Sequence, residues 1–166
     1  PSNAGWQRDL AVAHARVGDI HEARGTLDAA LAAYQESLAI SQRLAAQDPT
    51  NAGWQRNLAA AHSRVGGIHK ARGTLDAALA AFQETLAILK RLSAQDPGNA
   101  AWQRDLAVAH SKVGDIHEAR GTLDAALAAF QETLAISQRL AAQDPGNAGW
   151  QHDLALAYSR VGGIHG

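Results

Sequence analysis

Apolar side chains recur along the chain at alternating spacings of four and three residues, the period of an α-helix that buries one face. The first stripe, formed by Trp6, Leu10, Ala13, Val17 and Ile20, predicts a helix over residues 4–23. A second stripe predicts a helix over residues 27–47, and its apolar and small positions are Leu27, Ala30, Leu31, Tyr34, Ser37, Leu38, Ser41 and Leu44. Because only a short turn separates the two helices, we expect them to form an antiparallel hairpin.

Residues that favour helix ends stand at the predicted boundaries. Asn3 is placed to cap the free amide groups of the first helix. Gly25 suits the position after its end, and Thr26 is expected to cap the second helix. Asp48-Pro49 ends the second helix, because proline has no amide hydrogen and cannot continue the helix.

The whole unit recurs every 48 residues. The segment that begins at Asn3 returns at Asn51, Asn99 and Asn147. We expect a single repeat domain over residues 1–166, built from copies 3–50, 51–98 and 99–146 and a half copy 147–166. Because neither helix can cover its stripe alone, the copies must stack, which predicts an all-α solenoid of antiparallel hairpins. The chain starts at Pro1 rather than at a methionine, so we also expect it to be a piece of a longer protein.

The hairpin resembles the tetratricopeptide repeat. That family carries a large residue, a Leu-Gly step and a Tyr on its first helix, and Ala-x3-Phe and a Pro on its second. The matching residues are His14, Val17-Gly18, His21, Ala30-x3-Tyr34 and Pro49, then Val65-Gly66, Ala78-x3-Phe82, Pro97, Val113-Gly114, Ala126-x3-Phe130 and Pro145. The resemblance implies a right-handed superhelix, and it explains Gly18 as a point where two helices cross closely.

Two features depart from the family pattern. The usual repeat has about 34 residues, and the unit found here is 48 residues long. The spacing of Tyr34, Pro49 and Gly66 assigns about seven extra residues to each helix, which is two turns or roughly 10.5 Å. We interpret the unit as a tetratricopeptide hairpin lengthened by one heptad per helix. Histidine at the large-residue and Tyr positions is the second departure.

Composition and charge exclude several classes of protein. The chain has 15 Lys and Arg against 16 Asp and Glu, a formal charge of −1, so it lacks the cationic excess of a general nucleic-acid or membrane-surface binder. No apolar run approaches the roughly 18 residues of a membrane span, and the first residues do not resemble a signal peptide. We therefore expect a cytoplasmic protein. The absence of cysteine excludes a disulfide framework and a thiolate metal site.

Eight histidines raise the hypothesis of a metal site. His14 and His21 share a face but lie roughly 10.5 Å apart along the helix, and equivalent histidines of stacked copies should be roughly 8–10 Å apart. One ion needs donors much closer together, and the fourth copy has Tyr158 in place of His14. We therefore interpret the histidines as packing residues and expect no metal and no cofactor.

No nucleophile is paired with a base and an orienting group, so we expect no catalytic residues and no enzyme activity. A metal-dependent enzyme is the weakest of the functional hypotheses. The recurring tryptophans are expected to pack in the core against Leu44, Leu92 and Leu140, with ligand stacking as the alternative; they are Trp6, Trp54, Trp102 and Trp150.

The resemblance also implies a site, because the first helices of tetratricopeptide proteins line a concave groove that receives a peptide or a partner helix. On a helical projection, a second stripe of each first helix lies opposite the apolar stripe that faces the core, and we expect it to face the groove. The candidate groove residues are Arg8, Val12, Ala15, Arg16, Asp19, Glu22, Arg56, Ala60, Ser63, Arg64, Gly67, Lys70, Arg104, Val108, Ser111, Lys112, Asp115, Glu118, Ser159 and Arg160. An alternative interpretation is that these exposed positions vary without a function.

A row of arginines, Arg8, Arg56 and Arg104, marks one rim of the predicted groove. An acidic or phosphorylated segment of a partner could bind along it through charge-assisted hydrogen bonds. The opposing hypothesis is that these arginines pair with carboxylates of the chain, such as Asp9 or Glu36, and contribute little.

We therefore predict a non-catalytic scaffold that binds a protein or peptide partner, and neither nucleic acid nor membrane. The alternative is a structural spacer or self-assembling element, including a designed or idealised repeat, with no groove ligand. The half copy leaves Leu154, Val161 and Ile164 with an uncovered side, so we also predict self-association through the unpaired last helix.

Overall fold

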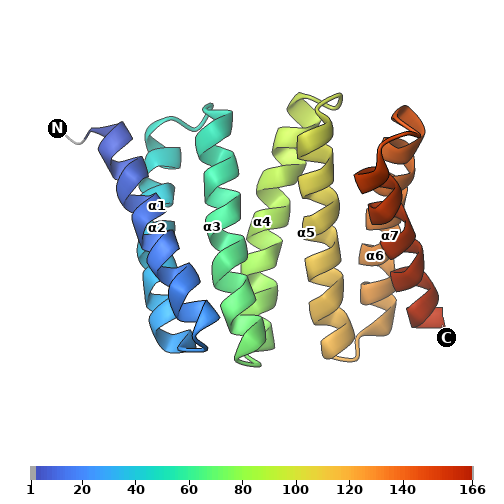
Figure 1. The fold of residues 1–166 in the computed structure, drawn as a ribbon, viewed down its shortest axis with the longest axis horizontal. Coiled ribbons are helices and arrows are strands. Elements are labelled where there is room, and N and C mark those ends of the chain that lie inside the picture. Colours follow the sequence, from blue (N-terminus) through green and yellow to red (C-terminus); the bar gives the residue numbers. More distant parts are fainter. Residues whose placement is uncertain (1–2, 166) are drawn as a thin grey trace. The chain divides into compact units, whose positions relative to one another are not determined.

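The computed structural model describes residues 3–165, which form helices joined by short turns and contain no strand (Figure 1). The helices are α1 (Ala4–Ala23), α2 (Leu27–Gln47), α3 (Ala52–Ala71), α4 (Leu75–Gln95), α5 (Ala100–Ala119), α6 (Leu123–Gln143) and α7 (Ala148–His165). The predicted bounds of the first hairpin are confirmed, and the later copies repeat them. No helix in this part of the chain combines the length and the apolarity that a membrane span requires.

The chain divides into two compact units, residues 1–88 and 89–166, and the boundary falls within α4. In the first unit α2 packs against both α1 and α3, and in the second unit α6 packs against both α5 and α7. Each of these second helices therefore lies between its own first helix and the first helix of the next copy. This is the predicted all-α arrangement of stacked antiparallel hairpins.

Local signals fix the helix ends. The Oδ1 atom of Asn3 accepts a hydrogen bond from the backbone amide of Trp6 at 3.2 Å, which confirms the predicted cap. Asn51, Asn99 and Asn147 cap α3, α5 and α7 in the same way. Gly25 has a φ of 77°, the left-handed conformation expected after the end of α1.

The predicted cap at Thr26 is wrong in its chemistry. Thr26 does precede α2, but its side chain makes no capping hydrogen bond. Its hydroxyl instead donates to the carbonyl oxygen of His21 at 3.0 Å and lies 3.0 Å from the Nδ1 atom of the same histidine. The backbone of Thr26, with a ψ of 74°, is not in the extended conformation usual for a cap. The hydroxyl therefore stabilises the end of α1 rather than the start of α2.

A glycine on each complete first helix lies directly against an aromatic ring of the second helix. A Cβ atom added to Gly18 would stand 2.5 Å from the ring of Tyr34, and one added to Gly66 would stand 2.7 Å from Phe82. The same contact occurs at Gly114. These distances are too short for a side chain, which confirms that the glycines mark the close crossing of the two helices.

The stripe of a first helix is buried by the second helix of the preceding copy. Ile68 of α3 is 1% exposed and packs with Val65 against Leu31 and Tyr34 of α2. Trp54 packs against the cluster that contains Leu44, and Trp150 against the cluster that contains Leu140. These contacts confirm the predicted packing of tryptophan against leucine in two of the copies.

In α1 the same stripe is open, so the prediction that Trp6 lies in the core is wrong. Trp6 is 75% exposed, and Leu10, Val17 and Ile20 are 52%, 48% and 54% exposed. The physical reason is that no second helix precedes α1 in the described chain to cover these side chains. We call this surface the end face.

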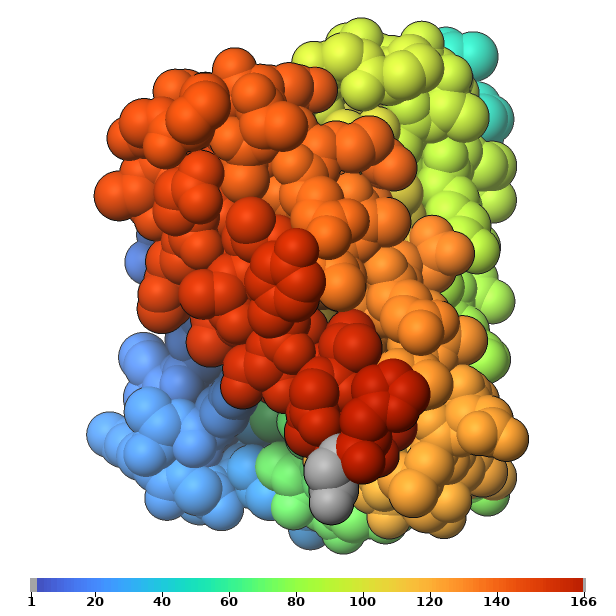
Figure 2. All heavy atoms as spheres, turned by 90° about the vertical axis from the view of Figure 1, so that its right-hand side faces the viewer, coloured from blue at the N-terminus to red at the C-terminus, as the bar shows by residue number. Residues whose placement is uncertain are grey.

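The prediction that the apolar stripe of the last helix is uncovered is also wrong. Leu154, Val161 and Ile164 are partly buried. The helix α7 packs on α6 (Figure 2), which accounts for this burial. The large apolar side chains that α7 exposes are instead Leu156 and Tyr158. Tyr158 lies on the side that a second helix of its own copy would cover, because it is the counterpart of the partly buried His14, whereas Leu156 is the counterpart of the exposed Val12.

Two adjacent glycines of α3 provide a matched test of the close crossing. We expect Gly66→Ala to lower the free energy of unfolding by about 1–3 kcal/mol, because the new methyl group overlaps the buried ring of Phe82. Gly67→Ala should leave stability unchanged or raise it by up to about 1 kcal/mol, since nothing lies within 4 Å of its Cβ position and alanine favours a helix. Urea denaturation followed by circular dichroism measures both, and equal midpoints for the two variants would contradict the packing described here.

Candidate functional site

Each unit contains a groove between two successive first helices. The first groove has a volume of about 340 Å³ and is lined by α1, α2 and α3, through Arg8, Ala11, Val12, Ala15, Arg16, Asp19, Ser37, Ser41, Leu44, Trp54, Asn57, Ala60, Ala61 and Arg64. The second groove has a volume of about 270 Å³ and is lined by α5, α6 and α7, through Arg104, Ala107, Val108, Ser111, Lys112, Asp115, Thr133, Ser137, Leu140, Trp150, Asp153, Leu156, Ala157 and Arg160.

Both grooves are built in the same way. Two first helices form the walls, and the second helix between them contributes buried side chains to the floor, such as Ser37 and Leu44 in the first groove. Small residues keep the middle open, and the walls also present apolar surface. Val12, Val108 and Leu156 are about half exposed. Such a surface offers both apolar contact and charged groups to a segment laid along the helices.

The structure brings part of the predicted set together in these grooves. The predicted residues in the first groove are Arg8, Val12, Ala15, Arg16, Asp19, Ala60 and Arg64, and those in the second are Arg104, Val108, Ser111, Lys112, Asp115 and Arg160. The remaining predicted residues lie outside both linings; they are Glu22, Arg56, Ser63, Gly67, Lys70, Glu118 and Ser159.

Several lining residues were missed by the sequence reasoning. A helical projection of one first helix cannot show the side chains that face it from the next copy, such as Asn57, Trp54, Asp153 and Trp150. One signal was available, because the equivalent position is aspartate in three copies, as Asp9, Asp105 and Asp153, and Asn57 in the second copy.

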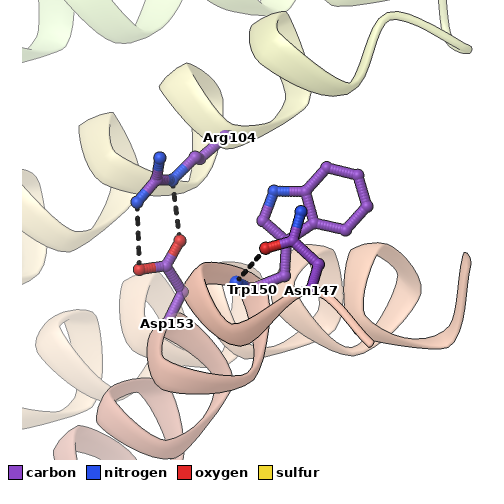
Figure 3. Close-up of polar contacts among 4 residues, drawn as sticks. All are labelled: Arg104, Asn147, Trp150 and Asp153. Carbon is purple, nitrogen blue, oxygen red and sulfur yellow. Dashed lines mark hydrogen bonds and ion pairs between the residues drawn. The ribbon is translucent and has the colours of Figure 1, made fainter. Parts of the chain in front are cut away.

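Two basic residues of the second groove form ion pairs with carboxylates of the chain. The guanidinium of Arg104 donates to both carboxylate oxygens of Asp153, at 2.7 and 3.3 Å (Figure 3). This contact with Asp153 raises the pKa of Arg104 further above its usual range. Arg160 pairs with Asp115, and its guanidinium carbon lies 5.4 Å from the centre of the Phe130 ring. The second groove therefore neutralises two of its cations internally.

The first groove differs at both of these contacts. Asn57 stands at the position of Asp153 and carries no charge. Asp19, the counterpart of Asp115, accepts a hydrogen bond from the Tyr34 hydroxyl at 2.7 Å, and Glu22 accepts a second one at 2.8 Å. Burial, followed by these hydrogen bonds, raises the pKa of Tyr34 far above its ordinary value, so the hydroxyl remains a donor.

As a result, the arginines of the first groove keep their hydrogen-bond donors available. Arg8, Arg16 and Arg64 make no ion pair or side-chain hydrogen bond with any residue from 3 to 165. Of the predicted arginine rim, Arg104 is paired within the chain and Arg8 is not.

Comparisons with known proteins agree with the fold. The family described as tetratricopeptide repeat matches residues 57–123. No curated protein sequence matches the chain. The crystal structure of BtubC (BKLC) from P. vanneervenii is similar with a TM-score of 0.72 at 18% identity, and the match covers 94% of this chain and 55% of that one.

A second solved structure is the first TPR domain of the human RPAP3 protein, determined by NMR, with a TM-score of 0.46 at 16% identity. That match covers 95% of this chain and 97% of the other. The chain spans about half the length of BtubC, and the likeness to BtubC concerns the fold alone.

Two of the histidines, His62 and His110, lie in packing positions. His110 is 8% exposed, and its burial lowers its pKa, with a further lowering by Lys90 that Glu132 opposes. Burial also lowers the pKa of His62, against the opposing charge of Glu84. Within residues 3–165, no three potential metal ligands gather at one point.

These lowered pKa values predict that acid destabilises the fold. Between the lower pKa of the folded state and the value near 6.5 of the unfolded chain, the unfolded state binds more protons, so stability is lost as the pH falls below about 6.5. We expect the His62→Gln/His110→Gln variant to lose less stability than the native chain between pH 7 and pH 5. Urea denaturation at each pH measures the difference. Parallel pH curves for the two proteins would refute this origin of the acid sensitivity.

Proposed function

We infer that the chain is a tetratricopeptide-repeat protein and acts as a non-catalytic protein-interaction scaffold, whose two grooves receive segments of a partner. The match of the tetratricopeptide repeat family to residues 57–123 supports the general role. The observation that supports the location is the recurrence of one groove design in both units, with first helices as walls and a second helix as floor.

The dimensions of the first groove suit an extended peptide. Arg8 and Asp19 lie near its two ends and are eleven residues apart on α1, which corresponds to about 16 Å. An extended chain covers this length with about five residues. Exposed apolar side chains such as Val12 would contact the partner's side chains, and the arginines would fix its charged or polar groups.

Peptides selected by display against the native chain test this proposal. We expect the Val12→Ser/Val108→Ser/Leu156→Ser variant to bind a selected peptide at least about tenfold more weakly, because it removes the exposed apolar surface of both grooves. The matched control is Ala32→Ser/Ala80→Ser/Ala128→Ser, which alters exposed positions of second helices outside the grooves. Titration calorimetry measures the affinities. The proposal fails if the control variant weakens binding as much as the groove variant.

The end face supports a second candidate function, a self-assembling element. It exposes Trp6, Leu10, Val17 and Ile20, whereas the counterparts of Val17 and Ile20 in α3 are buried under α2. An open apolar surface of this kind is typical of an interaction site. A second copy of the chain offers the exposed Tyr158 on its other terminal helix, α7, so the contact would be head-to-tail.

Sedimentation velocity over a range of concentrations tests self-assembly. We expect the native chain to form larger species as its concentration rises, and Trp6→Ser/Ile20→Ser to shift it towards the monomer, because the variant removes the two most exposed side chains of the end face. Val12→Ser, which alters the first groove instead, should leave the profile unchanged. A native chain that remains monomeric at every concentration would rule the second candidate out.

A further inference from the structure

The two grooves share one backbone design but present different charges. Each contains three cations at equivalent positions, namely Arg8, Arg16 and Arg64 in the first groove and Arg104, Lys112 and Arg160 in the second. The first groove contains one carboxylate, Asp19, and the second contains two, Asp115 and Asp153. One substitution between the copies removes a carboxylate from the first groove, and a second changes the partner of the carboxylate that remains.

The first substitution concerns the wall that faces Arg8. In the second groove this wall carries Asp153, whose two oxygens hold the guanidinium of Arg104 (Figure 3). In the first groove the same position is Asn57, an exposed amide that cannot form an ion pair. Arg8 therefore faces the first groove without a carboxylate to neutralise it.

The second substitution concerns the second helix. Phe130 has no hydroxyl, so Asp115 is available to Arg160, which also lies over the Phe130 ring. Tyr34 occupies the equivalent position in the first copy, and its hydroxyl donates to Asp19. This hydrogen bond holds Asp19 within its own hairpin, and Arg64 forms no ion pair with any described residue.

We propose that the first groove is a binding site for an anionic peptide segment, whose carboxylate or phosphate oxygens are bound by Arg8, Arg16 and Arg64. The proposal rests on the scaffold function and specifies the chemistry of the partner and the groove that binds it. Guanidinium groups recognise both kinds of anion through paired hydrogen bonds. Arg8 and Arg16 are eight residues apart on one helix, or about 12 Å, so the two anionic side chains of the ligand should be three to four extended residues apart.

Three labelled peptides of otherwise identical sequence test the proposal by fluorescence anisotropy. They carry two phosphoserines, two glutamates or two serines, four positions apart. We expect the native chain to bind at least one of the two anionic peptides at least tenfold more tightly than the serine peptide. The anionic peptide that binds more tightly identifies the preferred anion. Added salt should weaken this binding, because it screens exposed charges. Equal binding of all three peptides would overturn the proposal.

Single substitutions locate the site. Asn57→Asp restores the carboxylate that neutralises Arg104 in the second groove, and we expect it to weaken binding of the anionic peptide about tenfold. Tyr34→Phe, the residue found in the later copies, releases Asp19 to Arg64 and should also weaken it. The control is Gln35→Glu, which makes the same change in charge as Asn57→Asp at an exposed position outside the first groove. Unchanged affinity in Asn57→Asp, or an equal loss in Gln35→Glu, would overturn the proposal.

The displayed peptides separate this proposal from the scaffold function. A selected neutral peptide that is weakened by Val12→Ser but not by Asn57→Asp, together with no binding of either anionic peptide, overturns the anionic site and leaves the scaffold in place. If no peptide of any kind binds the native chain, both proposals fall.

Discussion

The structure depends on the burial of a first-helix stripe by the second helix of the preceding copy, as α2 buries the stripe of α3 and α6 that of α7. Ile20 and Ile68 occupy equivalent positions, yet Ile20 is more than half exposed and Ile68 is fully buried. The difference is the presence of α2 beside α3, since α1 follows no described helix. Stability in such a chain comes from contacts between neighbouring repeats, as expected for a one-dimensional array. The same contacts place successive first helices beside one another, so the packing that stabilises each unit also produces its groove.

The close crossing within a hairpin influences how a charged residue of the groove is paired. Because Gly18 and Gly114 have no side chain, the rings of Tyr34 and Phe130 lie directly against the first helix. In the first and third copies the residue after this glycine is acidic, namely Asp19 and Asp115, and the Tyr34 ring carries a hydroxyl that donates to Asp19. A single hydroxyl on that ring decides whether the carboxylate bonds within its own hairpin or pairs with an arginine of the next copy. The core and the charge of the groove are therefore coupled at one residue.

The helices could be predicted from the sequence because their signals are local. Asn3, Gly25 and Pro49 each act within a few residues of the boundary that they define. The exposure of Trp6 could not be predicted in this way, because it depends on whether another helix precedes α1. The hydroxyl of Thr26 was assigned to the wrong helix, since serving the end of α1 and capping α2 require the same residue type. Local chemistry thus determines the elements, and neighbours along the array determine which surfaces remain open.

For the groove, the sequence allows a prediction only of the lining residues that a single first helix supplies. The positions of Arg8 and Val12 in the groove could be predicted from the periodicity of α1. The roles of Asn57 and Asp153 could not, because they depend on the arginine that each faces on an earlier first helix. A repeat of nearly constant sequence makes such facing pairs visible, because the same two positions meet in each groove. A change from Asp to Asn on an exposed wall does not disturb the core, but it changes whether an arginine is neutralised by the chain or is available to a ligand. Near-identical repeats can in this way keep one architecture while their grooves differ in charge, which is the property that a scaffold needs to discriminate between partner segments.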